Sequence, residues 1–162
     1  FLLILKKTQL QFQKKMNRSA ELFFLFKRDL ESLRKELRQF TSEEKLWNVT
    51  GSITNSAGNL TLHICGNLRH YIGAILGGSH YVRNREAEFS NTNLPLNSLL
   101  QLIDESEKEL EQAFQKLSNA DLEKDFPVEV LNLKWITETF ILHLYGHFNY
   151  HLGQINYLRR VL

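Results

Sequence analysis

Helical periodicity is the feature that most limits the folds open to this chain. From Ser19, a predicted N-cap, a first segment places an apolar residue at every third or fourth position: Leu22, Phe26, Leu30, Leu33, Leu37 and Phe40. Charged residues fill most of the positions between them, which is typical of an amphipathic helix with one buried face. A chain of 162 residues that is 43% hydrophobic is long enough to bury such faces in one domain.

Three further segments have the same character. The second runs from about 57 to 76 and stops at Gly77 and Gly78, a common helix-terminating signal. The third is predicted to begin at a cap on Asn97, and its stripe comprises Leu99, Ile103, Ser106, Leu110, Phe114 and Leu117. The last runs from about 136 to 160, after a loop that contains Pro127 and the extended stretch EVLNLKW. We find no strand pattern of consequence.

These segments predict an all-α fold, a four-helix bundle over residues 17–162 with one long connection between helices 2 and 3. That connection, 79–95, has no helical stripe and is long for a compact domain, which makes it a crossover or a functional loop. Trp47 lies in the turn-rich connection 41–56 and is expected to cap one end of the bundle.

The first 16 residues are assigned to an N-terminal extension. FLLIL is followed by lysines, so its charge comes after the apolar run, the reverse of a signal peptide. The run is also far too short to span a bilayer. We therefore expect neither export nor membrane anchoring from this segment.

Charge and cysteine content narrow the classes of function. The 20 basic and 18 acidic residues are spread along the chain, which argues against a nucleic acid or an acidic membrane as partner. Cys65 is the single cysteine and lies in an apolar run, so it is expected to be a core residue. A protein without an internal disulfide fits the reducing cytoplasm.

The last helix carries three histidines four residues apart. At about 100° per residue from His143, the apolar stripe centres near about 60°, with His147 at about 40° and His151 at about 80°. His143 lies at the margin of the stripe. His147 and His151 are therefore predicted to point into the bundle.

The second helix shows a similar interruption. Its inward stripe contains His63 and Asn67, while His70 lies at the edge. Burying an imidazole without a partner costs on the order of 1–3 kcal/mol. Each histidine could satisfy itself with a carbonyl or carboxylate, but an i, i+4 pair plus a third from another helix favours a shared metal ion.

Imidazole nitrogens are ligands for zinc, nickel, copper and iron. We expect zinc or nickel here, with iron or manganese as alternatives. A carboxylate-bridged di-iron centre needs Glu-x-x-His on two helices, and a thermolysin-like protease needs His-Glu-x-x-His; neither motif occurs. Haem is disfavoured by the third nearby histidine and by the lack of C-x-x-C-H.

With these residues in view, the chain resembles the DinB/YfiT-like superfamily of metal-dependent proteins. An inward His on the second helix, HFNYHLGQI on the last, and GNLRHYIGAILGG followed by YVRNREAEF are similar to one uncharacterised DinB-like branch. The resemblance covers about residues 17–162. It implies a dimeric four-helix bundle that binds a divalent ion through His63, His147 and His151. It also implies, for some members, thiol-dependent transferase or isomerase activity with a low-molecular-weight thiol. His70, His80 and His143 have no counterpart in that triad.

Two classes of function stay open. In the first, the metal lowers the pKa of a bound thiol or water and delivers it to a small-molecule electrophile. In the second, the metal is structural or absent and the protein is a non-catalytic metal-binding or interaction module. Metal content, thiol dependence and the presence of an open coordination position discriminate them.

Five further residues are candidates for supporting roles. Asn67 and Gln154 are predicted to orient an imidazole or a water, or else to form plain interhelical hydrogen bonds. Arg83 and Arg85, in the 79–95 connection, are predicted to bind an anionic group of a thiol or substrate. The alternative for them is a surface pair with Glu88. Ser106 would open space opposite the ion, or is a packing compromise.

The sequence also predicts a homodimer. LFFLF at 22–26 is wider than one inward stripe, so Phe23, Phe24 or Leu25 needs cover from outside the bundle core. A second copy related by a two-fold axis is the commonest cover, and the family resemblance points the same way.

Overall fold

The computed structural model describes residues 17–162, and within them every regular element is a helix. The long helical segments are α2 (Arg18–Arg38), α3 (Ala57–Leu68) continued by η2 (Arg69–Leu76), α5 (Leu96–Lys116) and α7 (Thr137–Val161). The short ones are η1 (Glu44–Leu46), α4 (Arg85–Ser90) and α6 (Asn119–Leu122). The all-α prediction is confirmed. The extension predicted at 1–16 lies outside the described residues.

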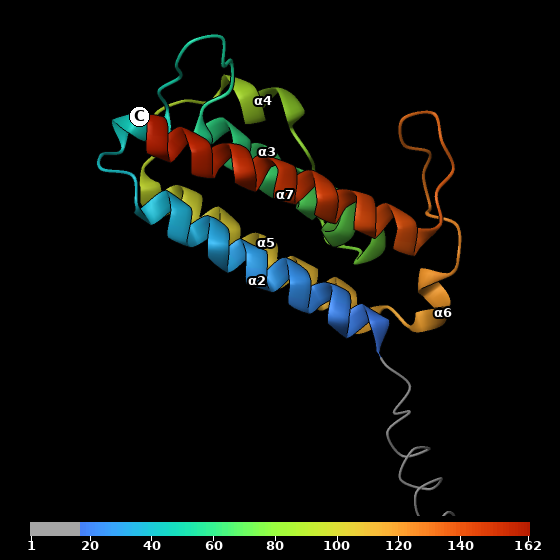
Figure 1. Ribbon diagram of the computed structural model, residues 1–162. Coiled ribbons are helices and arrows are strands. Elements are labelled where there is room, and N and C mark those ends of the chain that lie inside the picture. Colours follow the sequence, from blue (N-terminus) through green and yellow to red (C-terminus); the bar gives the residue numbers. More distant parts are fainter. Residues whose placement is uncertain (1–16) are drawn as a thin grey trace, which may run out of the picture.

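The long helices pack side by side, with α2 antiparallel to α5 and α3 antiparallel to α7 (Figure 1). α5 lies against α2, α3 and η2, while α7 lies across α2 and α3 on the other side (Figure 1). The predicted stripes face inward: Phe26, Leu30, Leu33 and Leu37 of α2 are fully buried. Helices with one wide apolar stripe are stable only when that stripe is covered by a neighbour, which the packing supplies.

Two predicted caps are wrong. The side chain of Asn17, not Ser19, accepts the hydrogen bond from the first turn of α2, at Ala20 N. Ser19 is buried, and its hydroxyl donates to the carbonyl of Phe114 on α5. At α5, the helix starts after Pro95, whose fixed φ suits a helix entry, so Asn97 lies within the first turn.

The second predicted helix has the expected ends, but its second half is wound differently. From Arg69 the helix is π-helical, and it ends at Gly77 and Gly78. A Cβ at Gly77 would lie 2.7 Å from Ala113 Cβ of α5, so the glycine permits close packing there. Wider π turns occur most often near functional sites, and this one directly follows the segment that carries His63.

The 79–95 connection shows no helical stripe in the sequence, yet it contains a short helix. It contains α4, capped by the Asn84 side chain on Ala87 N, and α4 packs against α3. The Asn59 amide donates to the carbonyls of Glu88, Phe89 and Asn91 and so ties α4 to α3. Six residues are too few to show periodicity, which explains the miss.

Two smaller expectations concern Trp47 and Cys65. Trp47 packs against the core, and its indole N–H donates to the carbonyl of Leu94. Cys65 is buried in the core as predicted, and burial raises the pKa of its thiol to about 11. Within residues 17–162, no helix combines the length and apolar character needed to cross a bilayer.

Candidate metal centre

Three histidines from two helices meet between α3 and α7. His147 and His151 are one turn apart on α7 and so share its inward face, while His63 approaches from α3. One ring nitrogen from each residue lies within 4.8 Å of the other two. His63 Nε2 and His147 Nε2 are 2.9 Å apart, and the three rings stand nearly perpendicular to one another.

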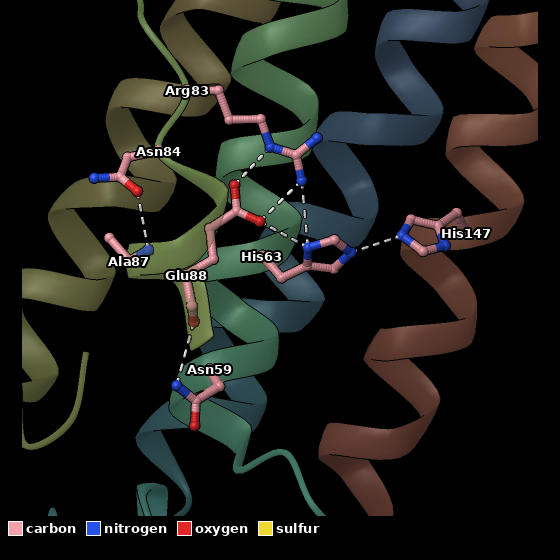
Figure 2. A network of polar contacts seen from close by, with 7 residues as sticks. All are labelled: Asn59, His63, Arg83, Asn84, Ala87, Glu88 and His147. Carbon is pink, nitrogen blue, oxygen red and sulfur yellow. Dashed lines mark hydrogen bonds and ion pairs between the residues drawn. The ribbon is translucent and has the colours of Figure 1, made fainter. Parts of the chain in front are cut away.

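His63 is fixed by a carboxylate. Its Nδ1 lies 2.8 Å from Oε2 of Glu88 on α4, and both side chains are buried (Figure 2). A carboxylate can only accept a hydrogen bond, so Nδ1 of His63 carries the proton and donates a hydrogen bond to Glu88. The lone pair of His63 is then on Nε2, the nitrogen that faces His147.

Glu88 is in turn held by Arg83. The guanidinium binds both carboxylate oxygens, with Nε 2.6 Å from Oε1 and Nη2 2.8 Å from Oε2 (Figure 2). Burial by itself would raise the pKa of Glu88, but the hydrogen bonds from Arg83 and His63 outweigh it and lower the pKa. Gly66 of α3 makes this approach possible, because a Cβ there would collide with the Glu88 carboxylate.

His151 has one satisfied nitrogen and one unsatisfied nitrogen. Its Nδ1 lies 2.6 Å from Gln154 Oε1, which accepts the Nδ1 proton. Its Nε2 is buried and has no hydrogen-bond partner. A buried acceptor without a partner is costly, and such groups in native proteins usually mark a bound water or ion.

The cluster is electrostatically suited to hold a cation. Burial, followed by repulsion from His151 and His63, lowers the pKa of His147 to about 4. Burial also lowers the pKa of His151, against the effect of its hydrogen bond to Gln154. Both imidazoles are therefore neutral at pH 7, and a neutral imidazole offers a lone pair to a metal.

The residues therefore fit a divalent metal ion. Two of the three histidines have their outer nitrogen bound to an oxygen acceptor, which orients the ring as metal-binding histidines require. Nitrogens that share one zinc at about 2.05 Å in tetrahedral geometry lie about 3.3 Å apart. The cluster is close to that arrangement, and the unpartnered Nε2 of His151 is the atom that an ion would satisfy.

Of the residues predicted to support the site, three lie near the histidine cluster and Ser106 does not. Asn67, Arg83 and Arg85 line a cavity of about 340 Å³ beside His63 and His147. Ser106 does not line that cavity: its hydroxyl donates to the carbonyl of Leu102 and lies near Cys65. A serine that bonds its own helix in this way is a packing residue.

The other histidines lie outside the triad. His143 stacks on Trp135 and Phe140 and lines the same cavity, farther toward the start of α7. His70 packs edge-on against Tyr71, and His80 is exposed.

Sequence reasoning missed the link between Glu88 and His63. It had weighed an Arg–Glu pair, but on the surface, and the pair is instead buried against an imidazole. The available signal was the pair of Arg83 and Glu88 in a segment that follows an inward histidine by about 20 residues. Spacing alone does not tell how such a segment folds back.

Residues 13–162 match the family described as "Protein of unknown function (DUF1572)". The chain belongs to the DUF1572 family. This family lies in the DinB/YfiT-like superfamily, which agrees with the resemblance seen in the sequence. Among curated proteins no significant match is found. The description of the DUF1572 family names no reaction.

Proposed function

We propose that this DUF1572 protein is a divalent-metal-dependent enzyme, a thiol-dependent transferase or isomerase, with His63, His147 and His151 as metal ligands. The buried and unpartnered Nε2 of His151 carries the proposal. A buried nitrogen without a hydrogen bond lowers stability by about 1–3 kcal/mol. The presence of such a nitrogen therefore supports a functional role for His151.

The superfamily relationship supports the same proposal. The long helices α2, α3, α5 and α7 correspond in number and order to a DinB-like four-helix bundle, with α4 in the connection between the second and third. The three histidines occupy the second and the last of these helices, as the resemblance implied. Zinc or nickel is the ion proposed, with iron or manganese as alternatives, because three nitrogen ligands suit the first two best.

The protein's own residues have defined tasks in this proposal. Glu88 and Arg83 hold His63, and Gln154 holds His151, so that the lone pairs of these two rings are directed into the cluster. A bound divalent ion would act as a Lewis acid that lowers the pKa of a coordinated thiol or water. The cavity beside His63 and His147 would position the electrophile, and its apolar wall would exclude bulk water.

The first experiment measures metal in protein purified without an affinity tag. We expect about one divalent ion per chain, and near-complete loss in His147→Ala with little change in far-ultraviolet helicity. The matched control is His143→Ala, one turn earlier on α7, which should retain the ion. Unchanged stoichiometry in His147→Ala would contradict the ligand assignment.

The second experiment tests the reaction. The metal-loaded protein is screened with low-molecular-weight thiols against panels of small electrophiles, with His147→Ala as the control for metal-independent background. Turnover that needs both metal and thiol is expected. A stoichiometric ion without any thiol-dependent turnover would instead favour the non-catalytic module.

We also infer that the protein is a homodimer that uses the outer face of α2. Phe24 is 64% exposed there, whereas Phe23 is partly covered by Phe114. Light scattering should report about twice the mass of one chain, and Phe24→Ser should shift the mass toward one chain. A wild-type mass near 19.0 kDa at micromolar concentration would refute the dimer.

A further inference from the structure

The cavity beside the histidine cluster has the composition of a ligand site. It measures about 340 Å³, and His63 and His147 form part of its lining. The apolar part of the wall comes from η2, the connection before α7, and α7 itself: Tyr71, Val130, Leu131, Phe140 and Leu144. This volume is at the lower end of the range for small-molecule sites, so it suits a compact ligand rather than a nucleotide or a peptide.

The charge in the cavity is unbalanced. Arg83 and Arg85 both line it, but Arg83 is neutralised by its two hydrogen bonds to Glu88. Arg85 forms no ion pair within residues 17–162, and its guanidinium carbon lies 5.5 Å from the centre of the Phe89 ring. No aspartate or glutamate lines the cavity. One guanidinium therefore remains without an anion.

A second polar group in the cavity lacks a partner. Asn67 Oδ1 is buried and accepts no hydrogen bond, and the side chain lies in the lining one turn after His63. In the part of the chain that the structure describes, Asn67 and His151 are the two half-buried residues that have a buried side-chain atom without a hydrogen-bond partner. Since His151 belongs to the cluster and Asn67 to the cavity, both point to missing ligands in one region.

A second cavity of similar size has no charged residue in its lining. It measures about 320 Å³ near the end of α7, between Tyr157, Val161 and the 52–55 segment, and no charged residue lines it. Its one contact with the centre is Gln154. The charged cavity is therefore the better place for an anionic ligand.

We propose that the cavity lined by Arg85 and Asn67 binds a small monocarboxylate. Its carboxylate pairs with Arg85, its carbon skeleton lies on the apolar wall, and a hydroxyl or N–H group donates to Asn67 Oδ1. One unpaired guanidinium matches one negative charge, and its planar fork fits a carboxylate. The proposal rests on the proposed function only in making this carboxylate the substrate; the binding site itself stands on the cavity.

The experiment uses two probes of nearly the same shape, 3-phenylpropionate and its neutral amide, with binding followed by ligand-observed NMR titration. We expect the acid to bind the full-length protein more tightly than the amide. Arg85→Gln should weaken the acid about fivefold and leave the amide unchanged, because a single accessible ion pair has a modest strength. Arg160→Gln, which removes an exposed arginine outside the cavity, is the matched control.

A third probe tests Asn67. 3-Phenyllactate adds one hydroxyl to 3-phenylpropionate, and we expect it to bind more tightly to the wild type. In Asn67→Leu, which keeps the volume and removes the acceptor, this advantage should disappear. If it persists, the hydroxyl binds elsewhere and the role of Asn67 is overturned.

Running each titration with zinc-loaded and with metal-free protein separates the two proposals. Equal affinity for acid and amide, or an acid preference that survives Arg85→Gln, overturns the carboxylate site even where metal binding is intact. An Arg85-dependent preference in a protein that retains no metal upholds the site and counts against the metal-dependent function.

Discussion

Two polar networks between the helices of this protein differ in one respect, and the difference identifies the site. Between α2, α5 and η2, Arg34 pairs with Asp104 and Glu107, and Arg69 pairs with Glu105 and Glu109. Every charged group there faces an opposite charge. Between α3, α4 and α7, the network runs from Arg83 through Glu88 to His63 and His147 (Figure 2). Beside it lies His151, whose buried Nε2 has no partner.

A closed network and an open network have different uses. The arginine pairs of α2 and η2 satisfy themselves, so they fix how the helices pack and offer nothing to a ligand. In the histidine network, the outer nitrogens of His63 and His151 form hydrogen bonds, whereas the inner Nε2 of His151 forms none. That polarity is expected of a binding centre, in which outer groups orient the inner ones toward something not supplied by the chain.

Breaking the closed network should have the largest effect on stability. Arg34 is 8% exposed, and Arg34→Ala would leave Glu107 without its closest cation. Because Lys27 also pairs with Glu107 and Asp104 is exposed, we expect the free energy of unfolding to fall by about 2 kcal/mol. Zinc affinity of the folded protein should not change. Chemical denaturation and metal titration measure the two quantities, and a large loss of zinc affinity would mean that the networks are coupled.

Weakening the outer part of the open network should act mainly on the metal. Glu88→Gln keeps the shape of the side chain but removes the charge that holds His63 and Arg83. We expect zinc affinity to fall by about 10- to 100-fold, as for other groups that orient a metal-bound histidine. Competition with a chromophoric chelator measures it. Glu109→Gln, which removes the charge of the half-buried carboxylate that accepts two hydrogen bonds from Arg69, serves as control and should leave affinity intact.

Replacing the unsatisfied group should stabilise the metal-free protein. In His151→Leu, the unpartnered Nε2 is exchanged for apolar atoms of similar size, so we expect the free energy of unfolding to rise by about 1 kcal/mol. The same variant should lose stabilisation by zinc. Thermal melts with zinc and with a chelator show both effects, and a less stable metal-free variant would mean that Nε2 has a partner in solution.

The pH dependence of the metal-free protein should show the smallest effect. The pKa of His147 is lowered to about 4 from 6.5, and that of His151 is lowered too. Between these values the unfolded chain binds more protons than the folded one, so stability is present at pH 7 and decreases as the pH falls from 6.5 toward 4. In His147→Asn the decrease from pH 7 to pH 5 should be smaller by several tenths of a kcal/mol, after allowance for partial exposure.

The local parts of this protein could be predicted from sequence because they depend on short spacings. Four residues make one turn, so His147 and His151 share a face of α7 whatever surrounds them. The buried stripe of α2 and the stop at Gly77 and Gly78 follow from similar rules. The errors at Ser19 and Asn97 are local too, since Asn17 and Pro95 competed for the same helix starts.

The tertiary structure decided the rest. The sequence by itself determined that three imidazoles point inward from two helices, because side-chain direction follows helical period. It did not determine that Glu88 meets His63, since this depends on Asn59 binding carbonyls in and just after α4 and on Gly66 leaving room for a carboxylate. Nor did it determine that the Ser106 hydroxyl binds a carbonyl of its own helix while Asn67 and Arg85 line the cavity. Contacts between segments distant in sequence are set by how the whole chain packs, and no spacing rule encodes them.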